Sequence, residues 1–325
     1  MTFRTGRRAI LLMSLFVTIL PSCGGDAASS PPFRNPVYDS DFPDPFVLLV
    51  DGTYHAYGTN SGGVNVQTLT STDLVHWRKG ADALPRLGEW AYAGKTWAPE
   101  VLARSDGTFV IYYTANAAAF GAQCIGRAEA RSPAGPFVDR STSPLVCQKR
   151  EGGSIDPSPF RDHEGRLYRL WKNDGNCCNG DTWIYAQRLS PDGLRLMGRR
   201  VRLVRQDTGW EASVVEAPTL WRHEGRYFLF YSGNAFDSDL YAVGYATCDG
   251  PLGPCRDAPS DPILKSACKA SGPGHQALVR HGRDTWIVYH AYAGGDKRVL
   301  WIDRLRWEAG KPVVAGPTCE PQPSP

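Results

Sequence analysis

The chain has 325 residues, of which 36 are Lys or Arg and 33 are Asp or Glu, so its formal net charge is +3. The positive excess comes from residues 1–22, which contain three arginines and no acidic residue and leave 33 basic and 33 acidic side chains in the remainder. A neutral remainder gives no electrostatic basis for binding nucleic acid, and we exclude that class of function.

Residues 1–23 have the features of an export signal. A basic start precedes the apolar run 9–20, which polar residues interrupt and which is too short for a comfortable membrane span. Residues 20–23, Leu-Pro-Ser-Cys, are similar to a bacterial lipobox, in which the cysteine becomes the lipidated N-terminus. We therefore expect a signal peptide of the lipoprotein type over 1–23, with an ordinary cleaved signal peptide as the alternative.

Either kind of signal would export the protein. A lipid anchor on Cys23 would hold it at the outer surface of a bacterial membrane, whereas ordinary cleavage would release it as a secreted protein. Residues 24–34 (GGDAASSPPFR) are rich in Gly, Ser and Pro. We expect them to form a linker that is flexible at first and then stiffened by proline.

A β-hairpin pattern repeats five times along the rest of the chain. In its clearest copy, Ser154–Trp171, an Asp-Pro step precedes a polar turn and an alternating aromatic strand. The turn glycines recur every 55–60 residues: Gly52, Gly107, Gly165, Gly225 and Gly282. A lone polar residue precedes each turn: Asp44, Glu100, Asp156, Glu216 and His275. This period predicts an all-β fold, a single five-bladed β-propeller over 35–325 with a short C-terminal tail.

A β-sandwich with coincidentally spaced hairpins is the alternative fold. We favour the propeller because the repeated unit includes the preceding polar residue as well as the turn. A propeller has to close its ring of blades. We expect the segment that begins at Asn35 to pair with the last blade, which ends in the alternating strand 298–307.

The cysteines indicate an oxidising compartment. Setting Cys23 aside leaves eight, an even number that favours disulfides. The sequence does not fix their connectivity, but sequence proximity and a possible tie between the last blade and the tail suggest four pairs: Cys124–Cys147, Cys177–Cys178, Cys248–Cys255 and Cys268–Cys319. A zinc site is the alternative use of these residues, and we disfavour it because no pair has the CxxC spacing.

The repeated polar residues predict where chemistry takes place. The first strand of each propeller blade lines the central channel, so residues at equivalent blade positions meet at one mouth of it. Carboxylates gathered there repel one another and lose solvent, so at least one pKa rises. Glycoside hydrolysis needs such a set, with one carboxylic acid to protonate the leaving oxygen and one carboxylate on the opposite face.

Five short motifs, one in each repeat and in the same order, resemble glycoside hydrolase family 43, the family of arabinanases, arabinofuranosidases and β-xylosidases. The resemblance extends from about Asn35 to Trp307. The motifs are Phe42-Pro43-Asp44-Pro45-Phe46, Thr96-Trp97-Ala98-Pro99-Glu100-Val101, Ser154-Ile155-Asp156-Pro157, Val215-Glu216-Ala217-Pro218 and Gly272-Pro273-Gly274-His275. Ala217 departs from the pattern, since many family members have Gly there.

The resemblance implies a catalytic role for each of three carboxyl groups. Asp44 would be the general base that activates water, and Glu216 would be the general acid. Asp156 would orient the acid and keep its pKa high. The family inverts the anomeric configuration, which requires the base and acid to be about 6.5–9.5 Å apart so that a water fits between them.

Further residues are expected to bind the sugar or a cation. Trp97 offers an aromatic wall, and Arg298 lies where the family has a sugar-contacting arginine. Phe46 and Glu100 belong to the motifs and are the remaining candidates for sugar contacts. The resemblance also makes His275 a candidate contact for a cation such as Ca²⁺ in the central channel, although one imidazole is a weak ligand for this ion. We expect no cofactor to be required.

These observations predict an exported, inverting glycosidase. Its substrate would be an arabinose- or xylose-containing oligosaccharide or polysaccharide of plant cell walls, with α-L-arabinofuranosyl favoured over β-xylosyl linkages. We expect the protein to act as a monomer. The alternative is a non-catalytic carbohydrate-binding propeller with the same pocket, which we disfavour because all three carboxylates are present.

Overall fold

A computed structural model describes residues 1–3, 6, 31–257 and 261–325. Most of the expected signal peptide and linker, including Cys23, lies outside the described residues. Within these ranges no helix is long and apolar enough to cross a membrane. The fold described below belongs to the compact unit 32–325.

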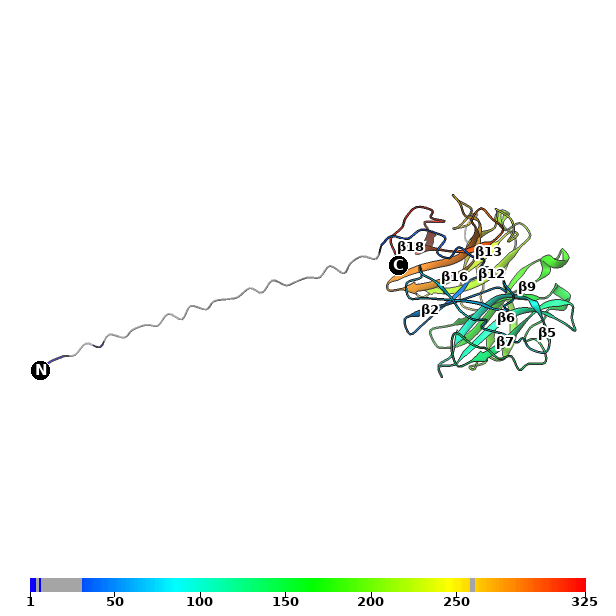
Figure 1. The fold of residues 1–325 in the computed structure, drawn as a ribbon, viewed down its shortest axis with the longest axis horizontal. Coiled ribbons are helices and arrows are strands. Elements are labelled where there is room, and N and C mark those ends of the chain that lie inside the picture. Colours follow the sequence, from blue (N-terminus) through cyan, green and yellow to red (C-terminus); the bar gives the residue numbers. More distant parts are fainter. Residues whose placement is uncertain (4–5, 7–30, 258–260) are drawn as a thin grey trace. The chain divides into compact units, whose positions relative to one another are not determined.

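Five antiparallel sheets follow one another along the chain, each with its strands in sequence order (Figure 1). Blade one contains β1 (Phe46–Val50), β2 (Thr53–Gly58), β3 (Gln67–Ser71) and β4 (Arg78–Lys79). Blade two contains β5 (Ala91–Ala103), β6 (Phe109–Ala117) and β7 (Ala122–Ala130). Blade three contains β8 (Ser154–Arg161), β9 (Leu167–Asn173), β10 (Trp183–Leu189) and β11 (Leu196–Arg205).

The last two sheets complete the ring. Blade four contains β12 (Val215–His223), β13 (Arg226–Gly233), β14 (Ala242–Cys248) and β15 (Cys255–Asp257). Blade five contains β16 (Ser271–His281), β17 (Asp284–Tyr292), β18 (Arg298–Glu308) and β19 (Lys311–Val314). Three short 3₁₀ helices lie between strands: η1 (Lys149–Glu151), η2 (Gly175–Cys178) and η3 (Gly209–Glu211). The structure is the predicted five-bladed β-propeller.

The turns explain why the repeat is visible in the sequence. In blades one and four, the first two strands are joined by two residues, Asp51-Gly52 and Glu224-Gly225, all with positive φ angles of 46–82°. A two-residue hairpin of this kind needs positive φ at both positions, which glycine adopts without strain. The equivalent glycine also has positive φ in the other three blades.

The hydrophobic core consists of clusters between neighbouring blades. Alternating strand residues bury one apolar set against the blade before and another against the blade after. Such clusters fill all five interfaces, including the one that joins blade five to blade one, where Val288 and Leu300 pack with Val47 and Leu69. Each blade is therefore held by burial on both of its faces.

The segment before β1 closes the ring, as expected. The Asn35 side chain donates to the carbonyl oxygen of Ile302 at 2.8 Å and accepts from its amide at 3.0 Å. Val37 and Tyr38 add backbone hydrogen bonds to Leu300. The N-terminal part of the propeller therefore lies along the free edge of β18, where β19 does not pair.

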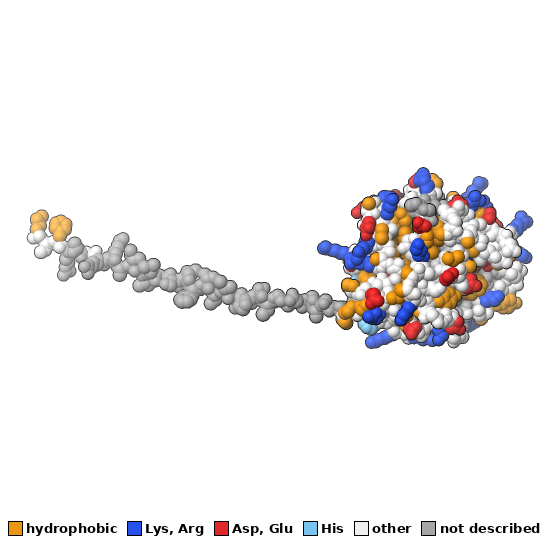
Figure 2. Space-filling model, turned by 90° about the horizontal axis from the view of Figure 1, so that it is seen from above, with side chains coloured by type: hydrophobic (Ala, Val, Ile, Leu, Met, Phe, Trp, Pro, Cys, Tyr) orange, Lys and Arg blue, Asp and Glu red, His pale blue; other side chains and the backbone are white. Residues whose placement is uncertain are grey.

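All four expected disulfides are present: Cys124–Cys147, Cys177–Cys178, Cys248–Cys255 and Cys268–Cys319. They use every cysteine after Cys23, which leaves none for a zinc site. Figure 2 shows basic and acidic side chains interspersed over the face in view, in keeping with the balanced charge of the chain.

Candidate active site

A β-bulge sets the direction of the site residues. The inner strands β5, β8, β12 and β16 each break register with their neighbour at the same point, and β1 begins just after the equivalent position. A bulge adds a residue to one strand and turns the chain locally, so that it re-aims a side chain. The bulged residues all have φ of 45–57°: Asp44, Ala98, Asp156, Ala217 and His275.

This alignment corrects the register expected from the sequence. Asp44, Asp156 and His275 hold equivalent positions, but Ala98 and Ala217 are their counterparts in blades two and four. Glu216 lies one residue before the bulge, and Glu100 lies two residues after it. The sequence pattern treats the polar residues as equivalent from blade to blade. In the structure, the equivalent residue of the first four blades is the one directly before the proline.

The bulges surround a pocket of about 370 Å³. Six residues that the sequence singled out line it: Asp44, Trp97, Asp156, Glu216, His275 and Arg298. Its other lining residues are Thr59, Ile155, Asp174, Asn176, Cys177 and Phe236. The three carboxyl groups assigned to catalysis by the resemblance therefore open into one cavity, from three different blades.

Asp44 lies beside the Arg298 guanidinium group, the Thr59 hydroxyl and the His275 ring. Thr59 donates to its Oδ2 at 2.5 Å, Arg298 donates to Oδ1 at 2.9 Å, and Nδ1 of His275 lies 3.3 Å from Oδ1. Burial by itself raises the pKa of Asp44, but Arg298 and His275 outweigh burial and hold the pKa well below its usual range. Asp44 is therefore an ionised carboxylate at all physiological pH values.

His290 supports Asp44 from beneath. The backbone amide of Asp44 donates to Nδ1 of His290 at 3.0 Å, so the proton of the neutral ring belongs on Nε2. His290 is fully buried, and this burial, together with the charge of Arg298, lowers its pKa well below the usual value. His290 consequently fixes the bulge without adding a charge.

Asp156 has a different environment from Asp44. Burial and the nearby Glu216 carboxylate raise the pKa of Asp156 to about 6, although His275 and Lys172 act in the opposite direction. The amide of Ala217 donates to its Oδ2 at 2.9 Å. This hydrogen bond ties Asp156 to the bulge that follows Glu216, so the two carboxyl groups are positioned together.

Glu216 is held by two donors, one from strand β9 and one from the connection between β13 and β14. The Tyr241 hydroxyl donates to Oε1 at 2.7 Å, and the Lys172 ammonium donates to Oε2 at 3.1 Å. Lys172 is fully buried and also donates to the Asn176 side chain at 2.7 Å. The Glu216 carboxyl group is thus fixed at both oxygens.

Two expected sugar contacts lie outside this pocket. The Phe46 ring packs on Tyr57 with centroids 6.3 Å apart, in the apolar cluster between blades one and two. Glu100 forms a hydrogen bond with Ser158, and burial with the charge of Asp156 raises its pKa well above the usual value. Both residues lie two positions after the bulge, where the strand directs them between blades.

The residues around His275 do not form an oxygen cage for Ca²⁺. This ion takes six to eight oxygen ligands, whereas the oxygens of Asp44 are already occupied by Thr59 and Arg298. Within the described ranges no group of three or more His, Cys, Asp or Glu side chains is arranged to hold a metal. No chemical step below uses a cation.

Sequence reasoning missed several residues that complete the site. Lys172 had a usable signal, because it is a cation directly after the aromatic, alternating strand pattern that ends at Trp171. Thr59 and His290 had none, since polar residues are common at strand ends. Phe236 and Tyr241 come from the connection between β13 and β14, and Phe236 stacks on the Arg298 guanidinium at 4.9 Å.

Comparison with known proteins identifies the family. The model of glycosyl hydrolases family 43 matches residues 33–312. The chain belongs to this family. A crystal structure of a thermostable family-43 glycoside hydrolase is 32% identical, with a TM-score of 0.82 over 90% of this chain and 99% of that chain. The propeller is accordingly a glycosidase, a hydrolase of glycosidic bonds.

Relatives within family 43 carry different activities in their names. A β-D-galactofuranosidase of Aspergillus niger is 26% identical over 88% of this chain and 86% of its own length. An extracellular endo-α-(1→5)-L-arabinanase of Bacillus subtilis is 24% identical over 83% of this chain and 86% of its own length. A putative β-xylosidase of Xylanibacter ruminicola is 26% identical over 87% of this chain, which spans only 50% of that protein.

Proposed function

We propose that the protein is an exported, inverting glycosidase that releases α-L-arabinofuranosyl residues from plant cell-wall polysaccharide or its oligosaccharides. The observation that carries this proposal is that Asp44, Asp156 and Glu216 line one pocket. Asp44 is ionised there, and Tyr241 and Lys172 hold the carboxyl group of Glu216 in place. Such a set supplies the two carboxyl groups, a base and an acid, that glycoside hydrolysis needs.

Asp44 is suited to be the general base. Its pKa lies well below the usual range, so the carboxyl group is in the deprotonated form that a base requires. In the proposed step, it takes a proton from a water molecule that attacks the anomeric carbon. Arg298 and Thr59 fix the carboxylate through hydrogen bonds to its two oxygens.

Glu216 is suited to be the general acid, which gives its proton to the departing glycosidic oxygen. Its two hydrogen-bond partners fix the direction of the carboxyl group, and Asp156 is tied to the adjacent backbone. Asp156 thereby orients the acid through the backbone that follows Glu216.

The choice of sugar rests on the pocket and on the relatives. Trp97 and Phe236 give the pocket two aromatic side chains for the sugar, and its volume of about 370 Å³ suits a small ligand. Two of the relatives are named for furanoside substrates, arabinan and β-D-galactofuranosides. A β-D-galactofuranosyl substrate is therefore the second candidate, ahead of β-xylosyl.

Product analysis tests the proposal. The full-length protein is incubated with aryl α-L-arabinofuranoside, β-D-galactofuranoside and β-D-xylopyranoside and with debranched arabinan, and the first-formed anomer is identified by NMR. We expect inversion and the highest kcat/KM on the arabinofuranoside. Asp44→Asn and Glu216→Gln should each lower kcat by about 1,000-fold or more on arabinan, because each removes one proton-transfer group.

Two results would overturn the proposal. Retention of anomeric configuration would exclude Asp44 as a base acting through water. Release of no sugar from any of these substrates by the wild-type protein would favour the non-catalytic, carbohydrate-binding alternative. Trp77→Phe, at a partly buried tryptophan in the apolar cluster between blades one and five, is the matched control and should keep wild-type kcat.

Export completes the proposed function. Four disulfides are typical of proteins that fold in an oxidising compartment. Two arabinanase relatives are named extracellular. We propose that a lipid on Cys23 holds the enzyme at the outer surface of a bacterial membrane, where large polysaccharides are accessible.

A further inference from the structure

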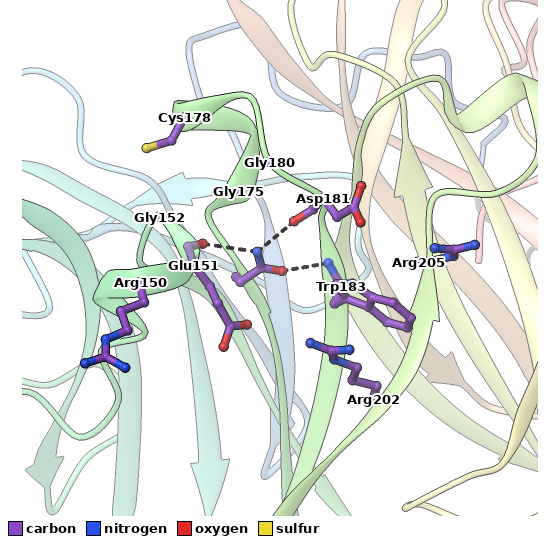
Figure 3. A pocket seen from close by; sticks show the side chains of 11 residues that line it. Arg150, Glu151, Gly152, Gly175, Cys178, Gly180, Asp181, Trp183, Arg202 and Arg205 are labelled. Atoms are coloured by element: carbon purple, nitrogen blue, oxygen red, sulfur yellow. Dashed lines mark hydrogen bonds between the residues drawn. The ribbon is translucent and has the colours of Figure 1, made fainter.

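Blade three has a second pocket of about 460 Å³, separate from the catalytic one (Figure 3). Its walls are η1, the connection 173–181 and the strands β10 and β11. Residues of the connection line both cavities. Asp174, Asn176 and Cys177 line the catalytic pocket, whereas Gly175 and Cys178 line the second one. A single stretch of chain, closed by the Cys177–Cys178 disulfide, therefore separates the pockets.

The dividing wall is firmly packed. The Asn173 side chain donates to the carbonyl oxygens of Glu151 and Asp181, at 3.1 and 2.8 Å, and accepts from the Trp183 amide at 2.7 Å. Gly152 lies so close beneath the wall that an added Cβ would be 2.1 Å from the Asp174 carbonyl oxygen. A pocket with such fixed walls is preformed for a ligand.

Three arginines bring positive charge to the lining of the second pocket. The guanidinium groups of Arg202 and Arg205 flank Trp183, at 4.6 and 5.6 Å from its ring, and Arg150 comes from η1 (Figure 3). Among the residues that the structure describes, no carboxylate lies within 4.0 Å of these three guanidinium groups. Arg202 gives one hydrogen bond to the Tyr185 hydroxyl, which leaves most of its donors free.

The two acidic residues of the pocket are engaged elsewhere. The Glu151 carboxylate pairs with Arg200, which does not line the pocket, and accepts hydrogen bonds from Tyr185 at 2.5 Å and Gln148 at 2.8 Å. One oxygen of Asp181 accepts from the Gln206 side chain at 3.0 Å. The available donors are therefore cationic, and they suit an anionic ligand.

The fork of a guanidinium group matches a carboxylate, and its plane stacks on flat or apolar faces. Because one stretch of chain lines both pockets, the second pocket is a neighbour of the catalytic one, and a longer polysaccharide could extend toward it. Uronic acids are the plant cell-wall sugars that combine a carboxylate with a ring. We propose that this pocket binds a uronic-acid residue of the same polysaccharide whose pentofuranosyl group enters the catalytic pocket.

The link to the polysaccharide rests on the proposed function, but uronate binding is measured without hydrolysis. Full-length protein carrying Glu216→Gln is titrated calorimetrically with methyl glucuronide, methyl galacturonide, the matching neutral glycosides and inorganic phosphate. We expect the uronides to bind at least about tenfold more tightly than the neutral glycosides and phosphate. The double substitution Arg202→Gln with Arg205→Gln should weaken uronide binding by about tenfold.

Arg199→Gln is the matched control, because Arg199 is an exposed arginine of the same strand that does not line the pocket. Equal losses in the control and the double variant would overturn the proposal. So would binding of phosphate as tight as that of the uronides, which would indicate a general anion site. Equal binding of neutral and acidic glycosides, or no binding at all, would also refute it.

Hydrolysis assays separate this proposal from the proposed function. With an otherwise wild-type catalytic site, the double variant should keep kcat/KM on an aryl pentofuranoside and lose about fivefold or more on an oligosaccharide that carries both pentofuranosyl and uronosyl groups. Pentofuranoside hydrolysis without uronide binding would refute only the second site. Uronide binding without hydrolysis would refute only the proposed enzyme activity.

Discussion

Asp44, Asp156 and Glu216 are buried to the same extent, with 7–8% of each residue exposed. Their different roles must therefore come from their neighbours. Arg298 and His275 lower the pKa of Asp44, whereas burial and Glu216 raise that of Asp156 to about 6. Two equally buried aspartates in one pocket therefore differ in charge state because their neighbours differ.

The raised pKa of Asp156 predicts a stability cost. Between pH 3.8 and about 6 the folded protein keeps this proton while the unfolded chain loses it, so stability falls as the pH rises and stays reduced above pH 6. Asp156→Asn removes the charge and can keep the hydrogen bond from Ala217. We expect it to raise the free energy of unfolding by up to about 3 kcal/mol at pH 8 and to leave it unchanged at pH 3.

Urea unfolding at the two pH values, with kcat measured in parallel, checks this prediction. The same variant should lose about 100-fold in kcat, because Asp156 no longer acts on Glu216. A stability gain that is equal at both pH values would show that the effect is not electrostatic. Wild-type activity would remove Asp156 from the mechanism.

At the scale of elements, the site depends on bulges at matching points of the inner strands. The bulged residues Asp44, Asp156 and His275 line the pocket, whereas Phe46 and Glu100, two positions after a bulge, lie between blades. The strands that carry the catalytic groups are in turn held by neighbouring blades, since apolar clusters fill every interface. The closure of blade five onto the N-terminal segment therefore supports the position of Asp44.

Asn35→Ala tests this closure. The change removes two hydrogen bonds to Ile302 and one to Thr318, so we expect the free energy of unfolding to fall by about 1–3 kcal/mol. Gln187→Ala, which removes one exposed hydrogen bond to Gly198, is the control and should have a smaller effect. Urea denaturation measures the free energy of unfolding of both variants. Equal decreases would show that the contact of Asn35 with β18 stabilises the fold no more than an exposed hydrogen bond does.

At the scale of the whole molecule, the propeller has balanced charge and four disulfides. Disulfides of this number are typical of proteins in an oxidising compartment. Its catalytic pocket draws side chains from all five blades: Asp44 from blade one, Trp97 from two, Asp156 from three, Glu216 from four and Arg298 from five. Loss of the ring would therefore separate the catalytic groups, so folding and activity should be lost together.

Replacing Cys23 with Ala tests the proposed anchor. In a bacterial host, we expect the wild-type protein in the membrane fraction and Cys23→Ala in the soluble fraction, because the acylated thiol is lost. Fractionation followed by pentosidase assay measures the distribution. The same distribution for both proteins would favour an ordinary signal peptide, and Cys124→Ala serves as a control for a cysteine within the propeller.

The sequence by itself determined the number of blades and the turn positions, because both depend on local chemistry that recurs at a regular spacing. It suggested the four disulfide pairs, but only the tertiary structure brings those cysteines together. It also singled out six of the residues that line the catalytic pocket. Only the tertiary structure decided the register of those residues, since a bulge changes which way a side chain points without changing the composition of the strand.

The tertiary structure also decided which other side chains reach the carboxyl groups. Thr59, Lys172, Tyr241 and His290 are far apart in sequence and come from four different blades. The same geometry placed Phe46 and Glu100 between blades rather than in the pocket. The physical reason is that pocket chemistry depends on distances between blades, and these arise only when the ring closes.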